Sequence, residues 1–380
     1  METLLKAVES KQPKMLAFLE QLVNIDSALD NPEGNKECAY IIGEKLATLG
    51  FAIEYFEYPG ICTHILAKRS GKSNKHIMIS GHTDTVFLSG TAKQRPFTVQ
   101  EGCAYGPGVA DMKGGIAMAV FVLEAMIEQG WDDTGVTLFF CGDEEPGHPK
   151  TNAPEIYEQE GQGKTAVFCL EPGRPNGEVV IGRKGVIIPE MHIKGIASHA
   201  MEPHLGANAV HEMARKISAI YKLQDINKGI LCNVGIAAGG TGASVVAEHA
   251  SLRFSIRFNK TSEGEEMLRA VRKIASTVTT PGTLTTIQDD RFLYLPFETT
   301  KAVEQLLAFV RKQGRKIGIT EIGALFQAGG SDACWTAKAG APTLCGMGPI
   351  GGFMHNEKEY ISLDGLMQRA KLLALCMKEI

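Results

Sequence analysis

The chain has 380 residues, of which 44% are hydrophobic and 22% are charged. This composition is typical of a globular protein with a large buried core and excludes the fibrous and disordered classes. The 43 aspartates and glutamates outnumber the 39 lysines and arginines, so no surplus of positive charge is available to bind a nucleic acid or an anionic membrane surface. At roughly 100–200 residues per domain, the length predicts two or three domains.

The N-terminal segment and the cysteines favour a cytoplasmic protein. Residues 1–14 carry charges at short intervals and lack the apolar run of a signal peptide. The longest apolar stretch, residues 116–123, is far shorter than the roughly 18 residues that a membrane span needs. The nine cysteines have no Cys-x-x-Cys spacing and mostly lie in apolar runs, so we expect buried thiols in a reducing compartment.

The main part of the chain alternates between strands and helices. Short apolar runs that end in polar or glycine-rich turns predict strands buried on both faces, at residues 76–80, 136–140, 166–170 and 342–345. Residues 114–129 predict a helix, with Met118, Val122, Ala125 and Met126 on one face and Gly130 at its end. Such alternation predicts an α/β fold with a mostly parallel sheet flanked by helices.

From about residue 184 the order changes to β-α-β-β-α-β. The expected elements are strands at 186–193, 230–237, 248–258 and 283–288, and helices at 207–223 and 263–278. Hydrophobic and polar residues alternate along 248–258, as expected for a strand with one solvated face. This order is that of a ferredoxin-like α+β domain. We therefore expect a discontinuous main domain, residues 1–183 and 297–380, interrupted by an inserted domain, residues 184–296.

Metal-competent side chains follow several of the predicted strands, at the edge where a parallel sheet presents its carboxyl ends. They are His82 and Asp84 after the first strand, Glu144 and Glu145 after the second, and Glu171 after the third. Asp111 lies in a glycine-bounded turn before the helix at 114–129, and His355 follows a glycine-rich loop. Two imidazoles and three of these carboxylates can hold a pair of divalent ions about 3.5–4 Å apart, if one carboxylate bridges them. A solvated acidic turn is the alternative for the paired glutamates.

These motifs resemble the zinc amidohydrolase family of bacterial glutamate carboxypeptidases, acetylornithine deacetylases and succinyl-diaminopimelate desuccinylases. The matching segments are residues 82–84, 106–115, 143–145, 171–172, 195–200 and 330–332. They follow the family's order between about residues 76 and 360. The surroundings of residues 84–86 and 96–97, and Ser198-His199-Ala200 followed by residues 205–209, are most similar to the glutamate carboxypeptidase branch.

The resemblance implies a zinc-peptidase-like fold and a dinuclear site. It implies that Asp111 bridges two divalent ions, with His82 and Glu171 completing one site and Glu145 and His355 the other. Zinc is the expected metal, with cobalt or manganese as alternatives.

The resemblance also implies roles for four further residues. Asp84 would orient the imidazole of His82, and Glu144 would act as general base and then as general acid. His199 would stabilise the oxyanion, from the neighbouring chain in dimeric relatives. Arg257 would grip a carboxylate of the substrate. The inserted domain would then serve as a lid and as the interface of a homodimer.

Three positions depart from the family pattern. Ser244 and Ala247 stand where many relatives carry Asn and Pro, which weakens any inference about substrate contacts in that loop. His148 stands where a small polar residue is common. Its imidazole could line the pocket, but we expect it on the surface.

The expected function is that of a cytoplasmic two-metal hydrolase. Its substrate would be an N-acyl amino acid or a small peptide with a free carboxylate, and neither a nucleic acid nor a membrane is an expected partner. The nearest alternative is an acetylornithine deacetylase or a succinyl-diaminopimelate desuccinylase. A metal-free binding homologue is the remote alternative, and it would require the loss of ligands that the sequence retains.

Overall fold

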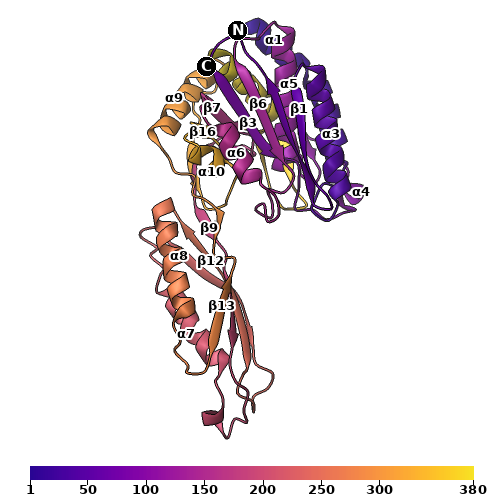
Figure 1. Ribbon diagram of the computed structural model, residues 1–380. Coiled ribbons are helices and arrows are strands. Elements are labelled where there is room, and N and C mark those ends of the chain that lie inside the picture. Colours follow the sequence, from indigo (N-terminus) through magenta and orange to yellow (C-terminus); the bar gives the residue numbers. More distant parts are fainter. The chain divides into compact units, whose positions relative to one another are not determined.

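The computed structural model describes residues 1–380, which divide into two compact units (Figure 1). The first unit comprises residues 1–182, 299–326 and 331–380, and the second comprises residues 183–298 and 327–330. The expected insert spanned residues 184–296, so the second unit contains it and adds the short segment 327–330. None of the helices has the length and apolarity that a membrane span requires.

The first unit is built on a six-stranded sheet in the order β1-β2-β6-β3-β7-β16. Its strands are β1 (Ala52–Tyr58), β2 (Cys62–Arg69), β3 (His76–His82), β6 (Gly135–Cys141), β7 (Ala166–Cys169) and β16 (Thr343–Leu344). The pairs β6–β3, β3–β7 and β7–β16 are parallel, whereas β1 and β2 form an antiparallel edge. The predicted mostly parallel sheet is thereby confirmed, with an antiparallel hairpin that the sequence did not predict.

Helices cover both faces of this sheet (Figure 1). The helices of the first unit are α1 (Glu2–Ser10), α2 (Gln12–Val23), α3 (Pro32–Thr48), α4 (Thr91–Gln94), α5 (Gly114–Glu128), α6 (Ala153–Gly161), α9 (Lys301–Arg315), α10 (Ala333–Lys338) and α11 (Leu363–Glu379). The sequence predicted that α5 has a single apolar face, but residues 114–126 are buried on every side. The reason is that α1, α2 and α11 pack against α5 in addition to β3.

Two smaller sheets complete the first unit. One has the order β17-β18-β5-β4, formed by β4 (Thr98–Gln100), β5 (Cys103–Tyr105), β17 (Gly351–Gly352) and β18 (Tyr360–Ser362). The other pairs β8 (Val179–Arg183) with β15 (Ala324–Gln327).

All nine cysteines are free thiols, as the sequence predicted. Eight of them are buried, and Cys103 is half-buried.

The second unit has an antiparallel sheet in the order β13-β10-β12-β9-β14, with β11 paired to β12. Its elements are β9 (Gly185–Ile187), β10 (Glu190–Lys194), α7 (Ala209–Tyr221), β11 (Leu231–Gly239), β12 (His249–Phe258), α8 (Thr261–Ser276), β13 (Leu284–Gln288) and β14 (Phe292–Tyr294). The strand expected at 186–193 is interrupted at Pro189, because proline cannot donate a hydrogen bond to a neighbouring strand. The remaining order confirms the predicted ferredoxin-like arrangement.

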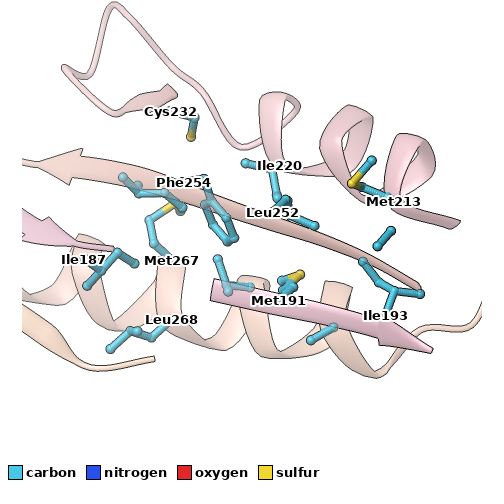
Figure 2. Close-up of a cluster of buried hydrophobic side chains, with 14 of the residues drawn as sticks. Ile187, Met191, Ile193, Met213, Ile220, Cys232, Leu252, Phe254, Met267 and Leu268 are labelled. Carbon is cyan, nitrogen blue, oxygen red and sulfur yellow. The ribbon is translucent and has the colours of Figure 1, made fainter. Parts of the chain in front are cut away.

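The core of the second unit is apolar (Figure 2). Leu252, Phe254 and Ile256 of β12 point into it and are at most 2% exposed. Side chains of α7 and α8, such as Met213 and Met267, pack against them. Alternate residues of β12 therefore face the helices, as the sequence pattern predicted.

Candidate metal centre

Five side chains of the first unit come together from five separate segments of the chain. Two groups of three potential ligands share Asp111: one contains His82 and Glu171, and the other contains Glu145 and His355. Within each group the ligand atoms lie within 4.8 Å of one another. The structure thus brings together all five ligand positions that the sequence predicted.

The carboxylate of Asp111 offers one oxygen to each group. Its Oδ1 lies 3.1 Å from Nε2 of His82, and its Oδ2 lies 3.3 Å from Nε2 of His355. The same Nε2 atoms each face a second carboxylate: Oε1 of Glu171 is 3.8 Å from His82 Nε2, and Oε2 of Glu145 is 3.3 Å from His355 Nε2. Asp111 is thus the one carboxylate that contacts an imidazole of each group.

The donor set fits a pair of divalent ions. Imidazole nitrogen and carboxylate oxygen are ligands of zinc, and manganese and cobalt accept the same donors. Oε1 of Glu145 is buried and has no hydrogen-bond partner in the protein. A buried oxygen without a partner is costly, and a cation at this position would satisfy it.

The imidazoles and carboxylates around Asp111 shift one another's pKa values. Burial opposes the charged form of His82, but Asp111 and Asp84 outweigh it and raise its pKa well above the ordinary value. Asp111 and Glu145 raise the pKa of His355 to about 10. For Asp111, burial is outweighed by hydrogen bonds from His355 and His82, which lower its pKa. The imidazoles and the carboxylates therefore stabilise each other's charged forms.

Asp84 is fully buried, and its carboxylate contacts both an imidazole and the main chain of the site. Its Oδ1 lies 3.3 Å from Nδ1 of His82, on the side of the ring opposite Asp111. The same carboxylate accepts hydrogen bonds from the backbone N–H groups of Glu144, at 3.1 Å, and Glu145, at 3.0 Å. Asp84 thus fixes both the ring of one ligand and the main chain of another, and only the first contact was expected.

Glu144 lies beside the ligands but in neither group of three. Its side chain is buried, with 8% of the residue exposed, and burial raises its pKa well above the ordinary value. The two consecutive glutamates are therefore placed differently. Glu145 belongs to the group of Asp111 and His355, whereas Glu144 belongs to neither group.

The prediction that His148 lies on the surface is wrong. The residue is 4% exposed, and its ring bridges two carboxylates, with Nδ1 2.9 Å from Asp143 and Nε2 2.7 Å from Asp332. The chain turns inward because Gly147 and His148 both adopt positive φ angles, 78° and 55°. Burial lowers the pKa of His148, but Asp332 and Asp143 outweigh it and raise the pKa well above the ordinary value.

His199 and Arg257 belong to the second unit. The exposed ring of His199 accepts a hydrogen bond at Nδ1 from the backbone N–H of Met201, at 3.1 Å. Its proton therefore lies on Nε2, which points away from that contact. The half-buried Arg257 donates through Nη1 to the carbonyl oxygen of Ala328.

Sequence reasoning gave no role to two buried charged residues near Asp111. Glu359 is fully buried and accepts backbone hydrogen bonds from the turn that carries Asp111. Lys113, 2% exposed, donates through Nζ to the carbonyl oxygens of Leu22, at 2.9 Å, and Ile25, at 2.8 Å. Lys113 belonged to a motif of the resemblance, but nothing in the sequence around Glu359 distinguishes it from a surface glutamate.

Comparisons with known proteins find relatives over nearly the whole chain. The carboxypeptidase G2 of Pseudomonas sp. (strain RS-16) is 27% identical to the chain over 386 aligned positions, which cover 99% of the chain and 92% of that protein. A succinyl-diaminopimelate desuccinylase of Burkholderia multivorans is 29% identical over 369 positions, covering 92% of the chain and 94% of that protein.

Solved structures are similar in fold. The aminopeptidase PepT of Bacillus cereus has a TM-score of 0.78 and 20% identity, with 97% of the chain and 98% of that structure covered. The metallo-carboxypeptidase Sso-CP2 of Sulfolobus solfataricus has a TM-score of 0.75 and 17% identity, with 96% and 98% covered. The sequence model of peptidase family M20/M25/M40 matches residues 78–379. The chain therefore belongs to peptidase family M20/M25/M40 and is a metal-dependent hydrolase of amide or peptide bonds.

Proposed function

We propose that the enzyme uses two divalent ions to cleave the amide bond of an N-acyl amino acid or a small peptide with a free carboxylate. The observation that carries this proposal is the position of Asp111, whose two oxygens lie 3.1 Å and 3.3 Å from one imidazole of each group. Two zinc ions held there, or cobalt or manganese, would polarise the scissile carbonyl and lower the pKa of the attacking water.

Glu144 is the proposed general base. A carboxylate whose pKa is raised by burial accepts a proton more readily than an ordinary one, and once protonated it can deliver that proton to the leaving amine nitrogen. Its buried position beside the ligands supports this role.

His199 is the proposed donor to the oxyanion. Because Nδ1 accepts a hydrogen bond from Met201, the protonated Nε2 is free to donate to a developing negative charge. The loop that carries His199 is fixed by backbone hydrogen bonds from Val246 to Ser198, at 2.9 Å, and from Ala200 to Ser244, at 3.0 Å.

We further propose that the second unit mediates a homodimer. Large apolar side chains are exposed around His199, namely Ile196, Met201, Leu205 and Val245, which are 43–81% exposed. The face of the sheet opposite α7 and α8 has no helix of its own unit packed on it (Figure 1). Analytical ultracentrifugation should give twice the chain mass of 41.0 kDa. A single-chain mass at micromolar concentration, with undiminished activity, would refute the dimer.

Arg257 is the proposed partner of the substrate carboxylate. The alternation of β12 keeps the guanidinium out of the core that holds Leu252 and Phe254. Its Nη1 contacts a carbonyl oxygen, and a guanidinium has further N–H donors for a bidentate carboxylate contact.

A second candidate function keeps the same chemistry with a different acyl group. Succinyl-diaminopimelate desuccinylases are 28–29% identical to the chain, compared with 27% for carboxypeptidase G2, but they cover 90–92% of the chain, compared with 99%. An acetylornithine deacetylase activity belongs to the same candidate class. The metal-free binding homologue is disfavoured, because all five ligand positions and Glu144 are present and close together.

A substrate panel tests these candidates. N-acyl-glutamates, dipeptides, N-acetylornithine and N-succinyl-diaminopimelate should be assayed with the zinc-loaded enzyme, with a chelated sample as the control. The proposal predicts the highest kcat/KM for N-acyl-glutamates or dipeptides, and loss of activity on chelation. Highest kcat/KM for N-succinyl-diaminopimelate or N-acetylornithine would assign the second function instead, and full activity in a protein shown to be metal-free would refute both.

A further inference from the structure

Glu359 connects two of the loops that supply ligands. It lies four positions after His355 and has no exposed surface. Its Oε1 accepts hydrogen bonds from the backbone N–H groups of Ala110, at 2.8 Å, and Asp111, at 2.9 Å. Its Oε2 accepts one from Gly108, at 3.1 Å. One carboxylate thus receives three main-chain donors from the turn that carries the shared ligand.

The turn depends on such an acceptor. Gly108 has a φ of 72°, and Ala110 is fully buried. Without the carboxylate, N–H groups of this turn would be buried without a partner, which is costly for each group. On the other side of the turn, the Lys113 ammonium holds the chain to the end of α2. The Asp111 turn is therefore fixed from both sides by charged groups that are not ligands.

The sheet pairing explains why Glu359 reaches this turn. Strand β18 follows Glu359 directly and pairs with β5, which leads into the Asp111 turn, with Tyr360 opposite Tyr105. The segment that returns from His355 therefore runs beside the segment that leads to Asp111. Glu359 lies where the two segments meet, and its side chain joins them.

We propose that Glu359 is a positioning residue of the metal centre. It holds the main chain of Asp111 so that one oxygen faces each group of ligands, and it fixes the distance from Asp111 to His355. This inference rests on the proposed two-metal function, since it concerns how the ligands of that site are preorganised. Loss of such an outer contact lowers metal affinity or activity by roughly 10- to 100-fold in other metal sites.

The variant Glu359→Gln tests the inference. Glutamine has nearly the same shape, but its amide nitrogen would meet at least one backbone donor instead of accepting its hydrogen bond. We expect zinc affinity, measured by competition with a chromophoric chelator, to fall by roughly 10- to 100-fold. The absorption spectrum of the cobalt-loaded protein should also change, because Asp111 would no longer be held in one orientation.

Glu124→Gln is the matched control. Glu124 is a buried carboxylate of the same unit, 7% exposed, which pairs with Lys11 and Lys45 and belongs to neither ligand group. Its loss should lower stability but leave zinc affinity and the cobalt spectrum unchanged. If Glu359→Gln does not fold, Glu359→Asp keeps the charge but is one methylene shorter, and it should show the same two changes to a smaller degree.

The outcomes separate this inference from the proposed function. A wild-type protein that binds no metal would refute the proposed function. A wild-type protein that binds two ions, with Glu359→Gln binding both at wild-type affinity and with an unchanged cobalt spectrum, would overturn the inference alone. Weaker binding in both Glu359→Gln and Glu124→Gln would also overturn it, because general destabilisation would then explain the loss.

Discussion

The two compact units stabilise their interiors in different ways. The core of the second unit is a continuous set of aliphatic and aromatic side chains, and its buried ion pair, Glu212 with Lys216, lies within one helix. The first unit buries charged groups around its ligand loops, and these groups come from distant parts of the chain. Glu359, for example, bonds to Asp111 across 248 positions, and His148 to Asp332 across 184.

This difference has a physical consequence for substitutions. In an apolar core, the cost of a truncation is the lost burial plus the cavity that remains. In a buried network of charges, removing one member leaves its partner without compensation. Substitutions in the first unit should therefore affect chemistry, metal binding and pH dependence together, whereas core substitutions in the second unit should affect stability alone.

The largest effect should come from the paired glutamates. Glu144→Gln should keep both metal ions but lower kcat by roughly 100- to 10,000-fold, because general acid–base catalysis contributes factors of this size. Glu145→Gln should lose metal as well, since Glu145 contributes to one ligand group. Steady-state kinetics and metal analysis of both variants measure this difference. Wild-type turnover in Glu144→Gln would exclude Glu144 as the base.

The next prediction concerns stability and compares the buried charges of the first unit with the apolar core of the second. His148→Ala leaves Asp143 and Asp332 without the cation that lies between them, and should lower the free energy of unfolding by about 3–5 kcal/mol. Leu252→Ala in the second unit should cost about 2–5 kcal/mol by creating a cavity. Urea unfolding of both variants at several pH values measures these costs.

The two costs should differ in their pH dependence. The pKa of His148 is raised in the folded protein, so its stabilisation is complete below its ordinary pKa of about 6.5 and is lost as the pH rises through the raised value. The cost of His148→Ala should therefore shrink at alkaline pH, whereas that of Leu252→Ala should stay constant. Equal pH profiles would contradict the charged bridge.

Arg257→Ala in the second unit should weaken the recognition of the substrate carboxylate. Loss of one partner of a desolvated charge pair costs roughly 2–5 kcal/mol, which lowers kcat/KM by about 30-fold to a few thousand-fold at 1.4 kcal/mol per decade. A substrate whose carboxylate is amidated serves as the control and should lose little. Equal losses on the acid and the amide would show that Arg257 supports the fold, and would break the assignment of substrate recognition to this unit.

The smallest expected effect is the release of protons when metal ions bind. His82 and His355 have raised pKa values in the protein alone, that of His355 being about 10. Metal ions bind the neutral imidazole, so binding at pH 7 should release protons, and the affinity should rise with pH up to about 10. Calorimetry in buffers of different ionisation enthalpy counts these protons. Binding without proton release would mean that the imidazoles are not ligands.

The parallel strands, and the polar side chains that follow them, could be predicted from the sequence for a physical reason. β3 and β6 contain short apolar runs followed by polar residues, so the strand and the metal-competent side chains at its end are encoded within a few residues. The break at Pro189 could also have been predicted, because the proline itself disfavours a continuous strand, but the predicted strand 186–193 ran through it.

The buried charges could not be predicted in this way. Neither His148 nor Glu359 lies in an apolar run, so each resembles a surface residue until its partners are known. Those partners are brought to them by the sheet and by α10, over separations of 184 and 248 residues. The same is true of α5, whose complete burial depends on α1, α2 and α11.

The central claim is that Asp111 bridges two divalent ions, and a zinc titration of the metal-free protein followed by calorimetry tests it most directly. We predict that the wild-type chain binds two ions and that Asp111→Asn loses tight binding at both sites, because one carboxylate serves both ligand groups. A wild-type chain that saturates with one ion, or an Asp111→Asn variant that still binds two ions with wild-type affinity, would contradict the claim.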